Sequence, residues 1–171
     1  MNIEEGEKAF TALDKERYFE DYIEGKSYEL GEVTVDYDEM VEFSRRFDPQ
    51  AMHIDEKEAL AGPFKGIIAS GWFTTSLAMK LFVCHYLSDV SSMASPGLDG
   101  LKWLHPVRGG DKLKVTATVK QTLRSRSKPD RGVVKTFLEV KNQNEILVMT
   151  IDGVNMVALN PDKLSEYEKT S

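Results

Sequence analysis

The chain has 171 residues, of which 41% are hydrophobic and 29% are charged. These proportions are typical of one compact domain and exclude a chain that is disordered throughout. The 28 acidic residues outnumber the 22 basic ones, which gives a formal charge of −6 and argues against a basic domain that binds nucleic acid. The single cysteine excludes an intrachain disulfide and a cluster of thiolate zinc ligands.

The N-terminal residues and the hydropathy of the chain indicate its location in the cell. No stretch approaches the roughly 18 apolar residues that a membrane helix needs. The first residues are acidic and lack the apolar region of a secretory signal, so we expect a cytoplasmic protein that is not bound to membrane. Residues 1–17 are mostly charged and predict an N-terminal arm, followed by a single domain over residues 18–171.

The first predicted elements are a strand and two helices. Apolar residues alternate over Lys26–Val35 around a glycine, which predicts a strand with a bulge. Asp36, with a glutamate three residues later, predicts the start of a helix. This helix is expected to stop at Asp48, because the next residue is proline. Asp55 is expected to cap a second, short helix over residues 56–61.

The segment from Gly71 to about Ser88 is the most apolar part of the chain. Its apolar residues occur nearly all round the helical projection, and Lys80 is its one clearly charged residue. We therefore expect a long helix that is wrapped on all sides, with Cys84 buried inside it as a small apolar residue and His85 in the core or at an interface.

Strands follow this helix. Residues 100–104, 112–123, 133–141 and 146–159 are rich in valine, threonine, isoleucine and leucine and are separated by turn residues. Helices followed by a run of hairpin strands favour the α+β class with an antiparallel sheet. A single sheet that curls around the apolar helix fits this order of elements best.

Two short motifs could carry chemistry. Asp48 and His53 lie five residues apart in a stretch stiffened by a proline, and a carboxylate beside an imidazole is an acid/base pair. Ser70 and Gly71 open the apolar helix, where free N–H groups and the helix dipole favour a developing oxyanion. Each motif also has a plain structural interpretation, as a loop histidine and as an ordinary helix start.

Taken together, these blocks resemble the MaoC-like dehydratases, the family of (R)-specific enoyl-CoA hydratases with the hot dog fold. The family pattern Asp-x-Asn-Pro-x-His-x-Asp is matched here from Asp48 to Asp55, and Phe-x-x-x-Ile-Ala/Val-His-Gly is matched from Phe64 to Gly71. A third block, from Pro106 to Asp111, is similar to the family's Pro-Val-x-x-Gly-Asp. Gln50-Ala51 replaces Asn-Pro, and Ser70 replaces the histidine.

The resemblance implies an antiparallel sheet wrapped around the central helix and a role for each matched residue. Asp48 and His53 would activate the water that adds across the 2,3 double bond of an enoyl thioester, and the Gly71 N–H would polarise the thioester carbonyl. It also implies an acyl-CoA substrate, with coenzyme A present as part of that substrate, no metal, no redox cofactor, and a homodimer.

Further residues are expected to contact substrate. Both tryptophans are interpreted as core or as the wall of an acyl tunnel. The basic run from Arg124 to Arg131 is either a solvated hairpin tip or a landing site for the phosphates of coenzyme A or an acyl carrier protein. The predicted substrate-binding residues are Ser70, Trp72, Trp103, Arg108, Arg124 and Arg126.

Two other functions remain open on the sequence. A hot dog thioesterase would hydrolyse the thioester, but such enzymes commonly place a carboxylate on or near the central helix, and Gly71–Ser88 carries no aspartate or glutamate. A protein that binds acyl thioesters without turnover would account for the altered residues Gln50, Ala51 and Ser70.

Overall fold

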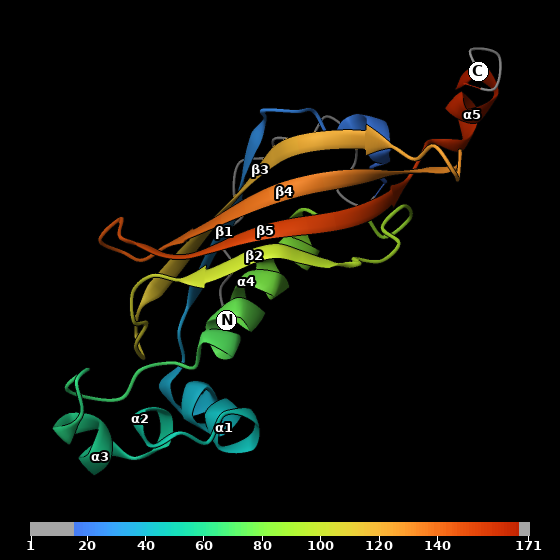
Figure 1. The fold of residues 1–171 in the computed structure, drawn as a ribbon. Coiled ribbons are helices and arrows are strands. Elements are labelled where there is room, and N and C mark those ends of the chain that lie inside the picture. The colour runs from blue at the N-terminus through green and yellow to red at the C-terminus, as the bar shows by residue number, and fades with distance from the viewer. Residues whose placement is uncertain (1–15, 168–171) are drawn as a thin grey trace.

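A five-stranded antiparallel sheet curls over one long helix, α4, in the computed structural model, which describes residues 16–167 (Figure 1). The strand order is β1-β3-β4-β5-β2, so β1 and β2 are the edges. This is the predicted α+β class and hot dog arrangement. No helix within residues 16–167 is long and apolar enough to cross a membrane.

The strands are β1 (Ser27–Thr34), β2 (Gly97–Trp103), β3 (Lys112–Arg124), β4 (Arg131–Lys141) and β5 (Leu147–Ala158). The helices are η1 (Phe19–Asp21), α1 (Tyr37–Phe47), α2 (Ala51–Ile54), α3 (Glu56–Ala61), α4 (Gly71–His85) and α5 (Pro161–Tyr167).

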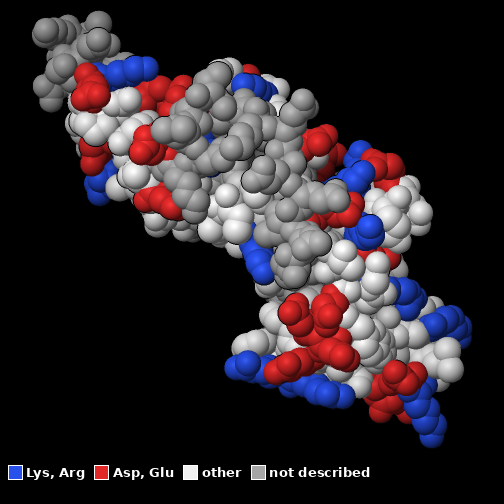
Figure 2. All heavy atoms as spheres, turned by 180° about the vertical axis from the view of Figure 1, so that it is seen from behind, with Lys and Arg blue, Asp and Glu red and all other residues white. Residues whose placement is uncertain are grey.

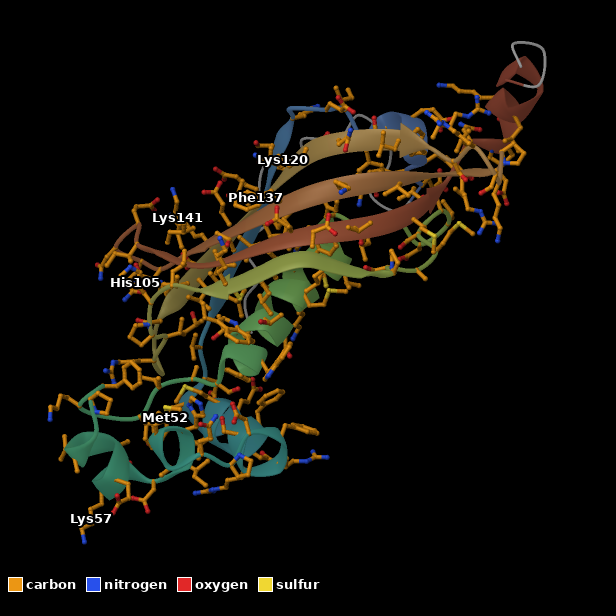
Figure 3. All side chains as sticks on the ribbon, viewed as in Figure 1. Met52, Lys57, His105, Lys120, Phe137 and Lys141 are labelled. Carbon is orange, nitrogen blue, oxygen red and sulfur yellow. The ribbon has the colours of Figure 1, made fainter. Side chains whose placement is uncertain are left out.

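The sheet has one buried face and one solvated face, as the alternating sequence predicts. In β3 the residues Leu113, Val115, Ala117 and Val119 point into the core, and the residues between them are exposed or half-buried. On the outer face, the Lys120 ammonium lies 5.0 Å from the centre of the Phe137 ring (Figure 3). The expected bulge in β1 is present at Gly31, where φ is +94° and the register with β3 shifts.

Helix α4 is covered on one side and open on the other. Phe73, Leu77 and Leu81 are buried against the sheet. On the opposite side, Trp72 is 55%, Met79 49% and Val83 41% exposed. The expectation that the helix is wrapped on all sides is therefore wrong for a single chain, because one curled sheet covers only one side of a helix. The expectation of burial is also wrong for Cys84, which is exposed.

Helices α1, α2 and α3 form a small lobe beside the sheet (Figures 1 and 2). Charges of both signs are spread over the visible surface of both parts (Figure 2). The predicted caps are confirmed, since Asp36 accepts a hydrogen bond from Glu39 N at 2.9 Å and Asp55 accepts one from Glu58 N at 3.0 Å. The lobe is joined to the sheet by the segment after α3, where Ala69 N donates to Val107 O at 2.8 Å.

The far end of α4 is held by a buried polar cluster. Arg17 is fully buried and donates to Leu87 O at 3.1 Å. The Tyr22 hydroxyl donates to Tyr86 O at 3.0 Å, and the Tyr86 hydroxyl lies 2.9 Å from Thr136 Oγ1 on β4. Burial raises the pKa of the Tyr86 hydroxyl far above its usual value, so this group stays protonated. Most of the arm expected over residues 1–17 lies outside the described residues.

The Tyr86–Thr136 hydrogen bond is expected to contribute measurably to stability. Tyr86→Phe leaves the Thr136 hydroxyl, which is buried, without this partner, and we expect a loss of about 1–3 kcal/mol in the free energy of unfolding. Urea denaturation measures it. The double variant Tyr86→Phe/Thr136→Val should recover part of this loss, because neither polar group is then left unpaired. An unchanged stability of the single variant would contradict this account.

Candidate active site

Asp48 and His53 face each other, as the sequence predicts. Asp48 caps the C-terminus of α1, and His53 is the third residue of α2, with Pro49 in the short link between the two helices. The Asp48 Oδ2 atom lies 3.5 Å from His53 Nε2. The side chains are only 18% and 6% exposed, so this pair is largely removed from bulk water.

The second contact of the His53 ring sets the tautomer of its neutral form. His53 Nδ1 lies 2.8 Å from the backbone oxygen of Ile68. A carbonyl oxygen can only accept, so Nδ1 must carry the hydrogen. In the neutral ring, Nε2 then presents a lone pair toward Asp48 Oδ2. Two acceptors this close leave no room for a molecule in line between them, but one water beside the pair can donate a hydrogen to each.

The Asp48 carboxylate is fixed by two neutral donors. The Ser70 hydroxyl donates to Oδ2 at 2.7 Å, and the Gln50 side-chain amide donates to Oδ1 at 2.7 Å. These two hydrogen bonds hold the pKa of Asp48 below its usual range, and the nearby His53 acts in the same direction. Ser70 and Gln50 are two of the residues at which the sequence departs from the family pattern. Here they orient the carboxylate and keep it ionised.

The start of helix α4 lies beside this pair because Ser70 belongs to both. Its hydroxyl oxygen accepts a hydrogen bond from Trp72 N at 3.2 Å, which confirms Ser70 as the helix cap. The N–H of Gly71 is in the first turn and has no partner within the helix. Among the described residues, none is seen to accept from it. The positive end of the helix dipole and this free donor therefore lie close to Asp48.

A cavity of about 260 Å³ opens onto His53 and Gly71. Figure 3 shows two of its lining residues, Met52 on α2 and His105 on the loop after β2, where the small lobe meets the sheet. Most of the lining is apolar, and it comes from three parts of the chain that are distant in sequence. The other lining residues are Phe64, Ile68, Ala69, Thr74, Trp103, Leu104, Pro106, Val107 and Val148.

The two tryptophans line different cavities. Trp103 lines the cavity that contains His53. Trp72 lines a larger cavity of about 510 Å³ on the open side of α4. The two rings meet edge to face, with centroids 5.3 Å apart.

The predicted arginines lie in two different parts of the structure. Arg108 contacts the backbone: its guanidinium donates to Ile67 O at 3.0 Å and also to Phe64 O, so it shapes the loop that leads to Ser70. Arg124 ends the 13-residue strand β3, which starts near the site and spans about 40 Å. Within one chain, Arg124 and Arg126 therefore lie at the opposite end of the sheet.

Sequence reasoning missed three contributors to the site. The Ile68 carbonyl sets the histidine tautomer, but a backbone acceptor has no signal in the sequence. The Gln50 amide was visible as a departure from the pattern, and its contact required the geometry. Thr75 lies one turn into α4, and its hydroxyl accepts from Trp103 Nε1 at 3.2 Å. In the described part of the chain, no three His, Cys, Asp or Glu residues are arranged to hold a metal ion.

Comparison with known proteins places the chain in a family. The model of the MaoC like domain matches residues 20–142, and the chain belongs to the MaoC-like dehydratase family. The uncharacterised protein YdeM of Bacillus subtilis is 30% identical over 125 residues, which are 72% of this chain and 86% of YdeM. A MaoC-like dehydratase from Rhodospirillum rubrum is 31% identical, with a TM-score of 0.79 over 85% of this chain and 99% of that one. The (R)-hydratase PhaJ1 from Pseudomonas aeruginosa shares the fold at 23% identity, with a TM-score of 0.65 over 84% of this chain and 86% of that one.

Removal of the Ser70 hydroxyl is expected to raise the pKa of Asp48. Ser70→Ala deletes the hydrogen bond that contributes most to the lowered pKa, so the carboxylate should take up its proton at a higher pH than in the wild type. Carbon NMR titration of the aspartate carboxyls measures this shift. Ser76→Ala is the matched control, because the Ser76 hydroxyl bonds Trp72 O on the exposed side of the same helix. Coincident Asp48 titration curves for Ser70→Ala and wild type would contradict this assignment.

Proposed function

We propose that the protein adds water across the 2,3 double bond of an enoyl-CoA thioester, or removes water in the reverse direction. One observation carries the proposal: Asp48 Oδ2 and His53 Nε2 face each other at 3.5 Å, beside the N-terminus of α4. This arrangement can hold and deprotonate one water, and the helix start can stabilise the negative charge that forms on the substrate.

The two hydrogen-bond acceptors, Asp48 Oδ2 and His53 Nε2, determine how the water is oriented for the reaction. A water beside the pair directs one hydrogen at Nε2, the other at Oδ2, and an oxygen lone pair at carbon 3 of the substrate. As the new C–O bond forms, one acceptor takes a proton, and the electrons of the double bond move onto the thioester oxygen. The Gly71 N–H donates to that oxygen. A proton from the dyad then reaches carbon 2, so the net change is the addition of one water.

The water, the Asp48–His53 pair and the Gly71 N–H supply every proton and hydrogen bond that this reaction needs. No electrons are gained or lost overall, so the proposed reaction needs no redox cofactor. Coenzyme A is part of the substrate. The contacts of Ser70 and Gln50 with the Asp48 carboxylate support turnover over binding alone, because they orient the group that must act on water. Thioester hydrolysis remains the alternative reaction, and α4 carries no carboxylate residue for it.

The assay is the hydration of crotonyl-CoA, followed by loss of the absorbance of the conjugated thioester. We expect turnover by the wild type and a fall in kcat/KM of about 10²–10⁴-fold in Asp48→Asn and in His53→Gln, since each removes one proton-transfer group. Asp38→Asn is the control, because Asp38 is exposed in the first turn of α1.

Two results would contradict the proposed hydratase. One is a folded wild type that hydrates none of a panel of short, long and branched enoyl-CoAs. The other is an Asp48→Asn variant with the wild-type rate. Release of free thiol from acyl-CoA with the double bond intact would instead identify a thioesterase.

We also propose that the protein is a homodimer. The open side of α4 and the edge strand β2 form one apolar surface, on which Trp72, Met79, Val83, Leu98 and Trp103 are 41–55% exposed. An exposed edge strand next to apolar side chains is suited to pairing with a second copy, which offers the same edge and the same surface.

A charge placed on this surface is expected to separate the subunits. Met79→Glu buries a carboxylate in the proposed interface, so light scattering should give the dimer mass for the wild type and the monomer mass for the variant. Lys57→Glu on α3, a larger charge change in the small lobe, should leave the dimer intact (Figure 3). A monomeric wild type, or a dimeric Met79→Glu variant, would contradict this interface.

A further inference from the structure

Residues 67–69, which lead into helix α4, are held from two sides, and Arg108 supplies part of one side. We propose that Arg108 is a positioning residue for the reaction. By fixing the Ile67 carbonyl, it keeps the Ile68 carbonyl on His53 Nδ1, and so it selects the tautomer of His53 that can act on water. This inference rests on the proposed function, since it concerns a proton-transfer group of that reaction.

The first observation is that both backbone groups of Ile68 face helix α2. Ile68 N donates to Met52 O at 3.2 Å, and Ile68 O lies 2.8 Å from His53 Nδ1. In an extended segment, the N–H and C=O of one residue point to the same side, and those of its two neighbours point to the other side. The direction of the Ile68 carbonyl is therefore tied to the directions of the peptide groups before and after it.

The second observation is that these neighbouring groups are held from the opposite side. Ala69 N donates to Val107 O at 2.8 Å, and the Arg108 guanidinium donates to Ile67 O at 3.0 Å. The segment thus lies between helix α2 and the loop that precedes β3. On the side of this loop, the Arg108 guanidinium is the contact made by a side chain, so a substitution can remove it alone.

The third observation is the turn that Arg108 spans. Its guanidinium also donates to Phe64 O, so it bridges both ends of the turn over residues 64–67. Within this turn, Lys65 has a φ of +56° and Gly66 a φ of +138°. The left-handed conformation is unfavourable for a lysine, and the turn therefore needs contacts from outside to keep its shape.

The backbone of Arg108 is itself fixed to the end of the sheet. Arg108 N donates to Asp111 Oδ2 at 2.8 Å, and Asp111 Oδ1 accepts from Gln143 Nε2 at 2.9 Å. Gln143 lies between β4 and β5, and its Oε1 atom accepts from the N–H of Lys112, the first residue of β3, at 3.0 Å. The guanidinium thus reaches the turn from a point that the sheet holds in place.

The tautomer matters because a competing hydrogen bond is available to His53. If the hydrogen moves to Nε2, the ring can donate directly to Asp48 Oδ2, which lies 3.5 Å away. Nε2 then has no lone pair for the water. The Ile68 carbonyl opposes this state by binding the hydrogen on Nδ1. Since a hydrogen bond to a charged group shifts such an equilibrium by about tenfold or more, a displaced Ile68 carbonyl favours the inactive tautomer.

Arg108→Met tests the inference, because it removes the guanidinium donors and retains an unbranched side chain. We expect kcat for crotonyl-CoA to fall by at least about tenfold and KM to stay within about threefold of the wild-type value. Arg108→Lys keeps one cationic donor for the turn and should recover part of kcat. Arg45→Met, on the exposed side of α1, is the matched control and should leave both constants unchanged.

Nitrogen NMR of the His53 ring reports the tautomer without any turnover. The wild type should carry the hydrogen on Nδ1, and Arg108→Met should shift the population toward the form with the hydrogen on Nε2. His53→Gln assigns the signals, and urea denaturation shows which variants are folded. If Arg108→Met does not fold, Arg108→Lys carries the test, with smaller changes in kcat and in the tautomer in the same directions.

The outcomes separate this inference from the proposed hydratase. A wild-type kcat in Arg108→Met, or a lowered kcat with an unchanged tautomer, overturns the role of Arg108. A raised KM with a wild-type kcat also overturns it and would instead support contact of Arg108 with the phosphates of coenzyme A. A shifted tautomer, with no hydration by any variant or by the wild type, would overturn the proposed hydratase and leave the effect of Arg108 on His53 supported.

Discussion

The hydrogen bond from the Ser70 hydroxyl to the Asp48 carboxylate is the interaction on which the site depends. It joins the end of α1 to the start of α4, two elements that the fold brings together from distant parts of the chain. The same hydroxyl oxygen caps α4, so the position of the carboxylate and the direction of the first-turn N–H groups are fixed by a single side chain. Because the donors to the carboxylate are neutral, it keeps its negative charge and its ability to accept a proton from water.

The division of the molecule into a small lobe and a curled sheet explains how the candidate site is assembled. The lobe contributes the carboxylate and the imidazole, and the sheet with its helix contributes the N–H donor and the apolar walls. The Arg108 guanidinium bonds Phe64 O and Ile67 O, and these contacts hold the segment between α3 and α4 against the loop that precedes β3. A charged side chain that the sequence associates with phosphate thus serves to position the loop before Ser70.

Sequence patterns predicted most of the fold because its elements have strong local signals. Alternation marked the strands, the caps at Asp36 and Asp55 marked the helix starts, and Pro49 marked a helix end. Helix α2 is a single turn, too short for periodicity to show. The exposed side of α4 was not predicted, since a uniformly apolar helix gives no indication of which side the sheet leaves open.

The juxtaposition of Asp48, His53 and the start of α4 was predictable from the sequence, but the contacts around them were less so. The Asp48–His53 pairing followed from spacing and family resemblance. The contact of Gln50 with Asp48 and that of Trp103 with Gly71 depend on side-chain directions across separate elements, which one sequence does not encode locally. The placement of Arg124 depends on the length of β3, which carries the basic run away from the start of α4.

The most direct test of the central claim is a crystal structure of the protein with butyryl-CoA bound. The account predicts that the thioester oxygen accepts the Gly71 N–H and that one ordered water bridges Asp48 Oδ2 and His53 Nε2 opposite carbon 3 of the acyl group. A thioester carbonyl directed away from α4, or a bridging water placed far from carbon 3, would contradict it.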